Sequence, residues 1–134
     1  MPKTIAWIED DTDIIEPVVE PLLDAKYRIR RFNTAREALE GKKEIREADL
    51  ILLDMLLRPG IGDRDWGTFP GLTLLRELRD EKIDIPVVVL SVVDRDEVKK
   101  QLDKLGVIEI LRKPVRPSYL KEVVERILAK KKSK

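Results

Sequence analysis

Residues 50–54 read Leu-Ile-Leu-Leu-Asp, a short apolar run that ends in an acid. The run is too short for a typical helix and lacks the polar alternation of a half-exposed strand, so it predicts a strand buried on both faces. Open parallel sheets place their ligand sites beyond the carboxyl ends of the strands, which is where Asp54 falls. Asp54 is therefore the first candidate functional residue.

Three other apolar runs also lead into polar residues. Residues 3–8 lead into Glu9, Asp10 and Asp11, residues 86–90 lead into Ser91, and residues 107–112 lead into Lys113. The carboxyl ends of parallel strands meet at one edge of a sheet. An acidic cluster, a single aspartate, a hydroxyl and an ammonium group are therefore expected at the same edge.

Strands and amphipathic helices alternate five times along the chain. We expect strands at 3–8, 27–32, 49–53, 86–90 and 107–112, and helices at about 12–25, 34–48, 71–80, 94–105 and from Pro117 onward. Five βα units predict one doubly wound α/β domain, with a parallel sheet covered by helices on both sides. Pro21 predicts a kink or a late start in the first helix, because an interior proline costs about 3 kcal/mol.

The segment at about 55–70 interrupts this alternation. It contains three glycines, two prolines, Trp66 and Phe69. Loops of this length are uncommon inside compact domains and are often functional. Because the segment follows the strand that carries Asp54, we expect it to pass close to that carboxylate. The alternative is a surface insertion for which Trp66 is a packing anchor.

The composition narrows the class of protein. The 134 residues are enough for one domain with a sizeable core. Lys and Arg (27) nearly balance Asp and Glu (26), which argues against nucleic acid or membrane partners recognised by bulk charge. The exception is the basic tail 129–134, which we expect to be a solvated helix end. There is no signal peptide and no membrane-length apolar run, so a cytoplasmic protein is expected.

The predicted cluster of acids suits a metal ion. The chain has no cysteine and no histidine, so a metal ion must be held by oxygen atoms. Converging carboxylates repel each other unless a cation joins them. Asp10 and Asp54 can share Mg²⁺ or Mn²⁺, while Lys113 and Ser91 can contact a phosphoryl oxygen. This set of groups suits transfer of a phosphoryl group to an aspartate.

Four stretches, in this order along the chain, carry a resemblance to a known family. They are Trp-Ile-Glu-Asp-Asp (7–11), Ile-Leu-Leu-Asp-Met (51–55), Val-Val-Leu-Ser (88–91) and Arg-Lys-Pro (112–114). Over residues 3–130 the chain resembles the receiver domain of two-component response regulators. The resemblance implies one receiver domain over residues 1–134, with a flavodoxin-like fold and strand order 2-1-3-4-5. It implies a phosphoryl donor that is a histidine kinase or a phosphotransfer protein.

The resemblance also implies the acceptor and its metal ligands. Asp54 matches the phosphoacceptor. Glu9 and Asp10 match the acidic pair that holds Mg²⁺, with Asp10 the more direct ligand and Glu9 acting through water. Leu56 would contribute its backbone carbonyl to the metal. Asp11 has the simpler role of capping the first helix.

Further positions are implied to contact the phosphoryl group or to signal its presence. Ser91 matches the switch hydroxyl, and Lys113 matches the lysine of the family, with a cis peptide bond between Lys113 and Pro114. Three features depart from the family pattern. Pro59 is five residues after Asp54, where the family commonly has a proline four residues after the acceptor. Ile110 replaces an aromatic residue that rotates on activation, and Val92 replaces a small residue. We therefore expect narrower access to the acceptor and a non-standard switch.

The rate at which the phosphoryl group is lost can also be predicted. Leu56 and Val93 match the positions that flank the attacking water in the family. Both side chains are apolar and have no group that orients water. We expect slow hydrolysis of the aspartyl phosphate, slower still if the loop around Trp66 covers the site.

Three functions remain open. The first is a signalling receiver, not an enzyme beyond promoting its own phosphorylation and dephosphorylation. With no output domain after the last helix, it would act on an unidentified downstream protein through the fourth helix, fifth strand and fifth helix, a face that can also form a homodimer. The second is a receiver-shaped adaptor that binds its partner without phosphorylation, which Val92, Ile110 and the long loop favour. The third is a small Mg²⁺-dependent enzyme, with Asp63 and Asp65 as its acid or base.

Overall fold

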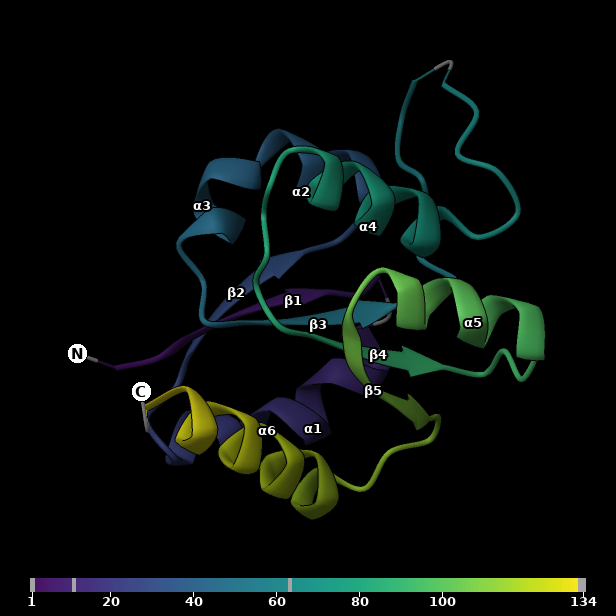
Figure 1. The fold of residues 1–134 in the computed structure, drawn as a ribbon. Coiled ribbons are helices and arrows are strands. Elements are labelled where there is room, and N and C mark those ends of the chain that lie inside the picture. Colours follow the sequence, from purple (N-terminus) through teal and green to yellow (C-terminus); the bar gives the residue numbers. More distant parts are fainter. Residues whose placement is uncertain (1, 11, 63, 133–134) are drawn as a thin grey trace.

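The computed structural model describes residues 2–10, 12–62 and 64–132 (Figure 1). Its five strands form one parallel sheet in the order β2-β1-β3-β4-β5. The strands are β1 (Thr4–Ile8), β2 (Arg28–Phe32), β3 (Leu50–Asp54), β4 (Val87–Ser91) and β5 (Val107–Arg112). The predicted α/β class and strand order are confirmed.

Helices cover both faces of the sheet. They are α1 (Thr12–Asp24), α2 (Ala35–Glu40), α3 (Lys42–Arg46), α4 (Pro70–Asp80), α5 (Asp96–Lys104) and α6 (Pro117–Lys132). In Figure 1, α1 and α6 lie on one face of the sheet, and α2, α3, α4 and α5 lie on the opposite face. None of the described helices has both the length and the apolar content to cross a bilayer.

The sheet separates two apolar clusters. Leu52 of β3 packs in the cluster on the side of α1 and α6, while its neighbours Ile51 and Leu53 pack in the cluster on the other side. Side chains alternate between the two faces of a strand, so a strand with helices on both sides must be apolar at successive positions. Every residue of β3 and of β4 is buried, which explains their uninterrupted apolar sequences.

The predicted helix at 34–48 is in fact two short helices. Thr34 caps the first of them, because its hydroxyl accepts a hydrogen bond from the amide of Glu37 at 3.0 Å. Gly41 lies between α2 and α3, where a Cβ atom would collide with the ring of Phe32. The sequence indicates Gly41 only as a weak position within one helix. It does not reveal the break, because the ring that faces Gly41 belongs to Phe32 of β2.

Helix α1 begins at Thr12, so the late start predicted from Pro21 is wrong. Pro17 and Pro21 both lie inside α1, and each lacks the N–H of a helical hydrogen bond. Val18 and Leu22 of the same helix are buried in the cluster shared with α6. Their burial offsets part of the cost of the prolines, at about 1.5–3 kcal/mol for each large apolar side chain.

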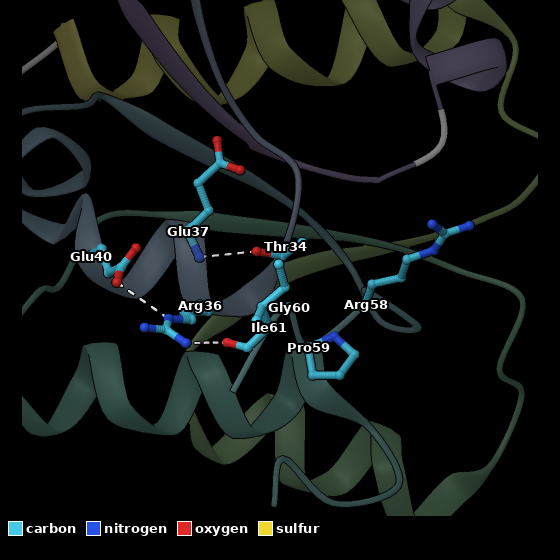
Figure 2. Close-up of a pocket in the computed structure, with 8 residues that line it drawn as sticks. All are labelled: Thr34, Arg36, Glu37, Glu40, Arg58, Pro59, Gly60 and Ile61. Atoms are coloured by element: carbon cyan, nitrogen blue, oxygen red, sulfur yellow. Dashed lines mark hydrogen bonds and ion pairs between the residues drawn. The ribbon is translucent and has the colours of Figure 1, made fainter. Parts of the chain in front are cut away.

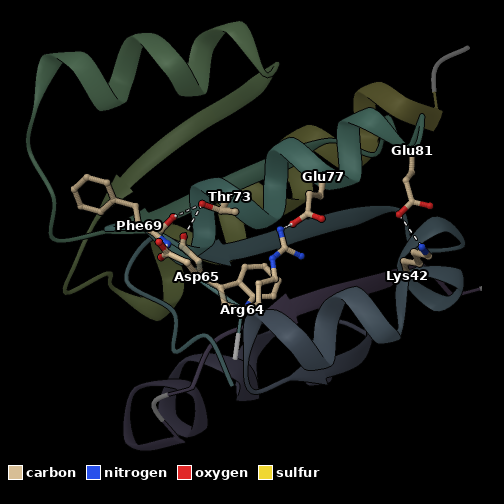
Figure 3. A network of polar contacts seen from close by, with 9 residues as sticks. Lys42, Arg64, Asp65, Phe69, Thr73, Glu77 and Glu81 are labelled. Atoms are coloured by element: carbon tan, nitrogen blue, oxygen red, sulfur yellow. Dashed lines mark hydrogen bonds and ion pairs between the residues drawn. The ribbon is translucent and has the colours of Figure 1, made fainter. Parts of the chain in front are cut away.

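Residues 55–69 join β3 to α4 without a helix or a strand in their described part. Trp66 is buried in an apolar cluster, and the Arg64 guanidinium lies 4.1 Å from the centre of its ring. Arg64 also forms an ion pair with Glu77 of α4, and the Thr73 hydroxyl donates to the carbonyl of Trp66 at 2.7 Å (Figure 3). Trp66 therefore anchors the loop to α4.

Candidate functional site

Three carboxylates meet at the carboxyl edge of the sheet. Glu9 and Asp10 directly follow β1, and Asp54 is the last residue of β3. The two strands are neighbours, with Ile8 in register with Leu53. One oxygen from each of the three carboxylates lies within 4.8 Å of the others. The structure thus brings together the three acids that the sequence analysis singled out.

The three acids differ in their exposure to solvent. Glu9 is fully buried and Asp54 is 5% exposed, whereas the side chain of Asp10 is 17% exposed. The Leu56 amide donates a hydrogen bond to Asp54 Oδ1 at 3.1 Å. Buried carboxylates need partners, because an unpaired charge in the interior is strongly destabilising.

Lys113 is the partner of the two buried acids. Its Nζ lies 2.7 Å from Glu9 Oε1 and 3.3 Å from Asp54 Oδ1. The Lys113 backbone amide donates to the Ser91 carbonyl at 2.9 Å, and the bond between Lys113 and Pro114 is cis, as the resemblance implies. Burial by itself lowers the pKa of the lysine, but the hydrogen bond to Glu9 and the nearby carboxylates outweigh it, so the pKa is raised. Lys113 is therefore cationic at neutral pH.

The pKa of Glu9 is raised from 4.5 to about 7. Burial is the largest cause, hydrogen bonding and repulsion by Asp54 add to it, and Lys113 opposes the shift. Lys113 and Arg58 supply two positive charges against three carboxylates, and the surplus negative charge suits a divalent cation. The carboxylate oxygens of Glu9, Asp10 and Asp54 are the hard donors that Mg²⁺ and Mn²⁺ prefer. These residues therefore fit the metal that the family implies.

Ser91 and several apolar residues are the other positions that the sequence analysis singled out. Ser91 ends β4 and is 3% exposed, and its hydroxyl oxygen accepts a hydrogen bond from the Val93 amide at 2.8 Å. Val92 is 57% exposed and Leu56 is 46% exposed. Ile110 is half-buried against the apolar cluster on the side of α2, α4 and α5.

Comparison with known proteins gives the family. The model of the response regulator receiver domain matches residues 5–125. The chain belongs to this family. The regulatory protein VanR of Enterococcus faecium is 32% identical over 122 residues, which cover 90% of this chain and 47% of VanR. The phosphate regulon transcriptional regulatory protein PhoB of Pseudomonas aeruginosa is 32% identical over 129 residues, 95% of this chain and 51% of PhoB. The chain spans about half the length of these relatives.

Solved receiver structures share the fold. The receiver domain of a putative LuxO repressor protein from Vibrio parahaemolyticus superposes with a TM-score of 0.81 at 22% identity, covering 98% of this chain and 94% of that one. A two-component response regulator from Clostridium difficile gives a TM-score of 0.76 at 25% identity, covering 95% and 96%. These similarities agree with the sheet order described above.

Two residues near the three acids of this receiver domain escaped the sequence analysis. Gly71 lies in the first turn of α4, where a Cβ atom would collide with the Asp54 carbonyl and lie 3.0 Å from that of Met55. Glycine thus lets α4 start directly against the backbone of Asp54. Arg58 forms an ion pair with Asp10, with Nε 2.9 Å from Oδ2. The sequence Pro70-Gly71 hints at the first feature, and nothing in the sequence indicates the second.

Of the remaining acids of the sequence analysis, the structure describes only Asp65. Asp11, with its expected capping role, and Asp63 lie outside the described residues, as do the last two residues of the basic tail. Asp65 is exposed and accepts a hydrogen bond from the Gly67 amide at 2.8 Å, within the loop. Trp66 packs in an apolar cluster, and its carbonyl accepts a hydrogen bond from the Thr73 hydroxyl of α4.

Proposed function

We propose that this receiver domain accepts a phosphoryl group on Asp54 in a Mg²⁺-dependent reaction and passes the signal on by protein contact. The observation that carries the proposal is the surroundings of Asp54. This carboxylate lies beside the ammonium of Lys113 and within a set of three acids that fit a divalent cation. A nucleophile so placed has the charge partners that phosphoryl transfer requires.

Each residue around the acceptor has a separate role in the proposal. Asp54 attacks the phosphorus atom and forms a new P–O bond as the P–N bond of a phosphohistidine donor breaks. Glu9, Asp10 and the carbonyl of Leu56 help to hold Mg²⁺, which when bound neutralises charge on the phosphoryl oxygens. Lys113, already 3.3 Å from Asp54, is the cation nearest to the new phosphoryl group.

Ser91 is proposed as the group that senses the phosphoryl group. Its hydroxyl oxygen accepts from the Val93 amide, and its hydrogen donates to the Val93 carbonyl at 3.4 Å, a long bond that it can exchange for one to a phosphoryl oxygen. Such a turn would pull on the segment that joins β4 to α5. Ile110 does not reproduce the aromatic movement of the family, so the proposed switch depends on Ser91 and Lys113.

Protein partners complete the proposal. The donor is a histidine kinase or a phosphotransfer protein, in the cytoplasm. The receiving partner, or a second copy of the chain, would contact the face formed by α5, β5 and α6. Ile108 of β5 is 52% exposed and Tyr119 of α6 is 46% exposed, which supports an apolar contact there. The balanced charge of the chain gives no reason to add nucleic acid or membrane as a direct partner.

The experiment is incubation with a small-molecule phosphodonor, with and without Mg²⁺, followed by intact mass spectrometry. We expect one added phosphoryl group on the wild type with Mg²⁺, none without it, and none on Asp54→Asn. Asp65→Asn is the matched control, because it removes an exposed acid of the loop, and it should be phosphorylated normally. A folded wild type that binds Mg²⁺ but takes no phosphoryl group would favour the phosphorylation-independent adaptor.

A further inference from the structure

Arg58 places a positive charge at the opening of the acidic site. Its Nε lies 2.9 Å from Asp10 Oδ2, and its side chain is 81% exposed, whereas that of Asp10 is 17% exposed. Asp10 is also one of the three acids that fit Mg²⁺. The guanidinium and a divalent cation therefore use the same carboxylate.

The backbone of Arg58 is fixed, although its side chain is exposed. The preceding residue, Leu57, is buried in an apolar cluster. The carbonyl of Arg58 accepts from the Ala35 amide at 2.9 Å, and the carbonyl of Pro59 accepts from the Arg36 amide at 3.0 Å. These bonds satisfy amides of the first turn of α2, which have no partner inside the helix. The loop thus holds the base of Arg58 in place, and movement is left to its side chain.

The direction of the Arg58 side chain agrees with a fixed backbone and a movable side chain. Figure 2 shows the Arg58 side chain extending away from Arg36 and Glu40. Arg36 is held by Glu40 and by the carbonyl of Ile61. The neighbouring arginine is therefore occupied with the loop and α2, and Arg58 is the one that contacts the acids.

We propose that Arg58 is a second cation, besides Lys113, that contacts the phosphoryl group, and that Mg²⁺ replaces its guanidinium as the partner of Asp10. In the metal-free protein it neutralises Asp10. When Mg²⁺ binds, the guanidinium leaves Asp10 and contacts the phosphoryl group that arrives at Asp54. Oxygens of Asp10 and Asp54 lie within 4.8 Å of each other, so a group that contacts the first is within reach of a phosphoryl group on the second. The planar guanidinium suits phosphoryl oxygens. This inference rests on the proposed phosphorylation of Asp54.

Replacement of Arg58 by Gln should strengthen Mg²⁺ binding and slow phosphorylation. Mg²⁺ should bind about two- to fivefold more tightly, because a competing cation is removed and exposed ion pairs have this strength. At saturating Mg²⁺, the rate constant for phosphorylation by a small-molecule donor should fall by about the same factor. General damage to the site would weaken both. Arg58→Lys keeps the charge and should restore most of both values.

Arg28→Gln is the matched control. Arg28 is exposed at the start of β2, whereas the site lies at the opposite ends of the strands, and the substitution removes the same charge. The backbone carbonyl at position 58 can accept from Ala35 whatever the side chain, so Arg58→Gln should fold, and its thermal midpoint confirms this. Mg²⁺ affinity is measured by calorimetric titration and phosphorylation by intact mass over time.

The outcomes separate this inference from the proposed function. Tighter Mg²⁺ binding together with slower phosphorylation in Arg58→Gln, and neither in Arg28→Gln, supports the role of Arg58. Unchanged values in Arg58→Gln, or equal changes in the two variants, overturn it. If wild type binds Mg²⁺ but takes no phosphoryl group, the proposed function fails, and the contact of Arg58 with the phosphoryl group fails with it. The Mg²⁺ titration of Arg58→Gln still decides whether Arg58 and Mg²⁺ compete for Asp10. If wild type does not bind Mg²⁺, both are overturned.

Discussion

Glu9→Gln is expected to change how the stability of the protein depends on pH. Glu9 is fully buried, and burial together with Asp54 raises its pKa from 4.5 to about 7. A carboxyl whose pKa is higher in the folded protein than in the unfolded chain stabilises the fold while it is protonated. That stabilisation is complete below pH 4.5 and is lost as the pH rises through about 7. A glutamine at this position imitates the protonated form at every pH.

The size of the change in stability follows from the shift in the pKa of Glu9. A difference of about 2.5 pH units corresponds to about 3 kcal/mol in the free energy of unfolding. Between about pH 5 and pH 8, wild type should therefore lose about 2–3 kcal/mol relative to Glu9→Gln. For a chain of this length, about 1 kcal/mol moves the thermal midpoint by about 4 °C. The difference between the two midpoints should change by about 10 °C over that range.

The assay is urea and thermal unfolding followed by circular dichroism, in buffers of equal ionic strength that contain a chelator. Glu122→Gln, an exposed acid on α6, is the control and should run parallel to wild type. Saturating Mg²⁺ should narrow the difference between wild type and Glu9→Gln above pH 7, because the metal stabilises the ionised acid. Parallel curves for wild type and Glu9→Gln in chelator would refute this explanation of the site.

Three further outcomes are expected. Gly71→Ala should lower the free energy of unfolding by about 1–3 kcal/mol in urea, because its Cβ atom meets the backbone of Asp54; Gly41→Ala, which meets a side chain able to rotate, should cost less. The aspartyl phosphate should persist for many minutes by intact mass, and Leu56→Asn, which adds a group able to orient water, should shorten its life; wild-type decay within seconds would contradict this. Lys113→Met should destabilise the protein by about 3 kcal/mol at pH 8 and by less at pH 5, measured in urea, because fewer of the acids it leaves behind are charged at low pH.

Much of the fold follows from the sequence because the central strands are covered on both faces. In β3 and β4 every residue is buried, so their apolar runs have no competing interpretation. Helix boundaries depend on contacts between distant parts of the chain. Gly41 separates α2 from α3, and the ring of Phe32, from another element, occupies the space that a Cβ atom would need there. No local pattern contains that information.

The residues of the site also fall into those that the sequence indicates and those that only the structure reveals. Asp54, Ser91 and Lys113 could be assigned because each stands at the end of a strand, where a parallel sheet must place its functional groups. Gly71 and Arg58 could not, since each is defined by a residue far along the chain that it contacts, the acceptor backbone in one case and Asp10 in the other.

The long loop meets both of its expectations at different points. At Arg58 it contributes a charge to the acidic site, as expected for a segment that leaves the strand of Asp54. At Trp66 it is anchored to α4 by packing and by the hydrogen bond from Thr73. Loop conformation depends on such anchors, which sequence alone does not supply, so the alternatives could be separated only in the structure.

The central claim is that Asp54 accepts the phosphoryl group, and reductive trapping tests it most directly. Borohydride converts an aspartyl phosphate to homoserine, which fragmentation mass spectrometry assigns to a position in the chain. After treatment with Mg²⁺ and a small-molecule phosphodonor, homoserine is predicted at position 54 in wild type and nowhere in Asp54→Asn. Homoserine at another acid, or its absence from a protein that binds Mg²⁺, would contradict the account.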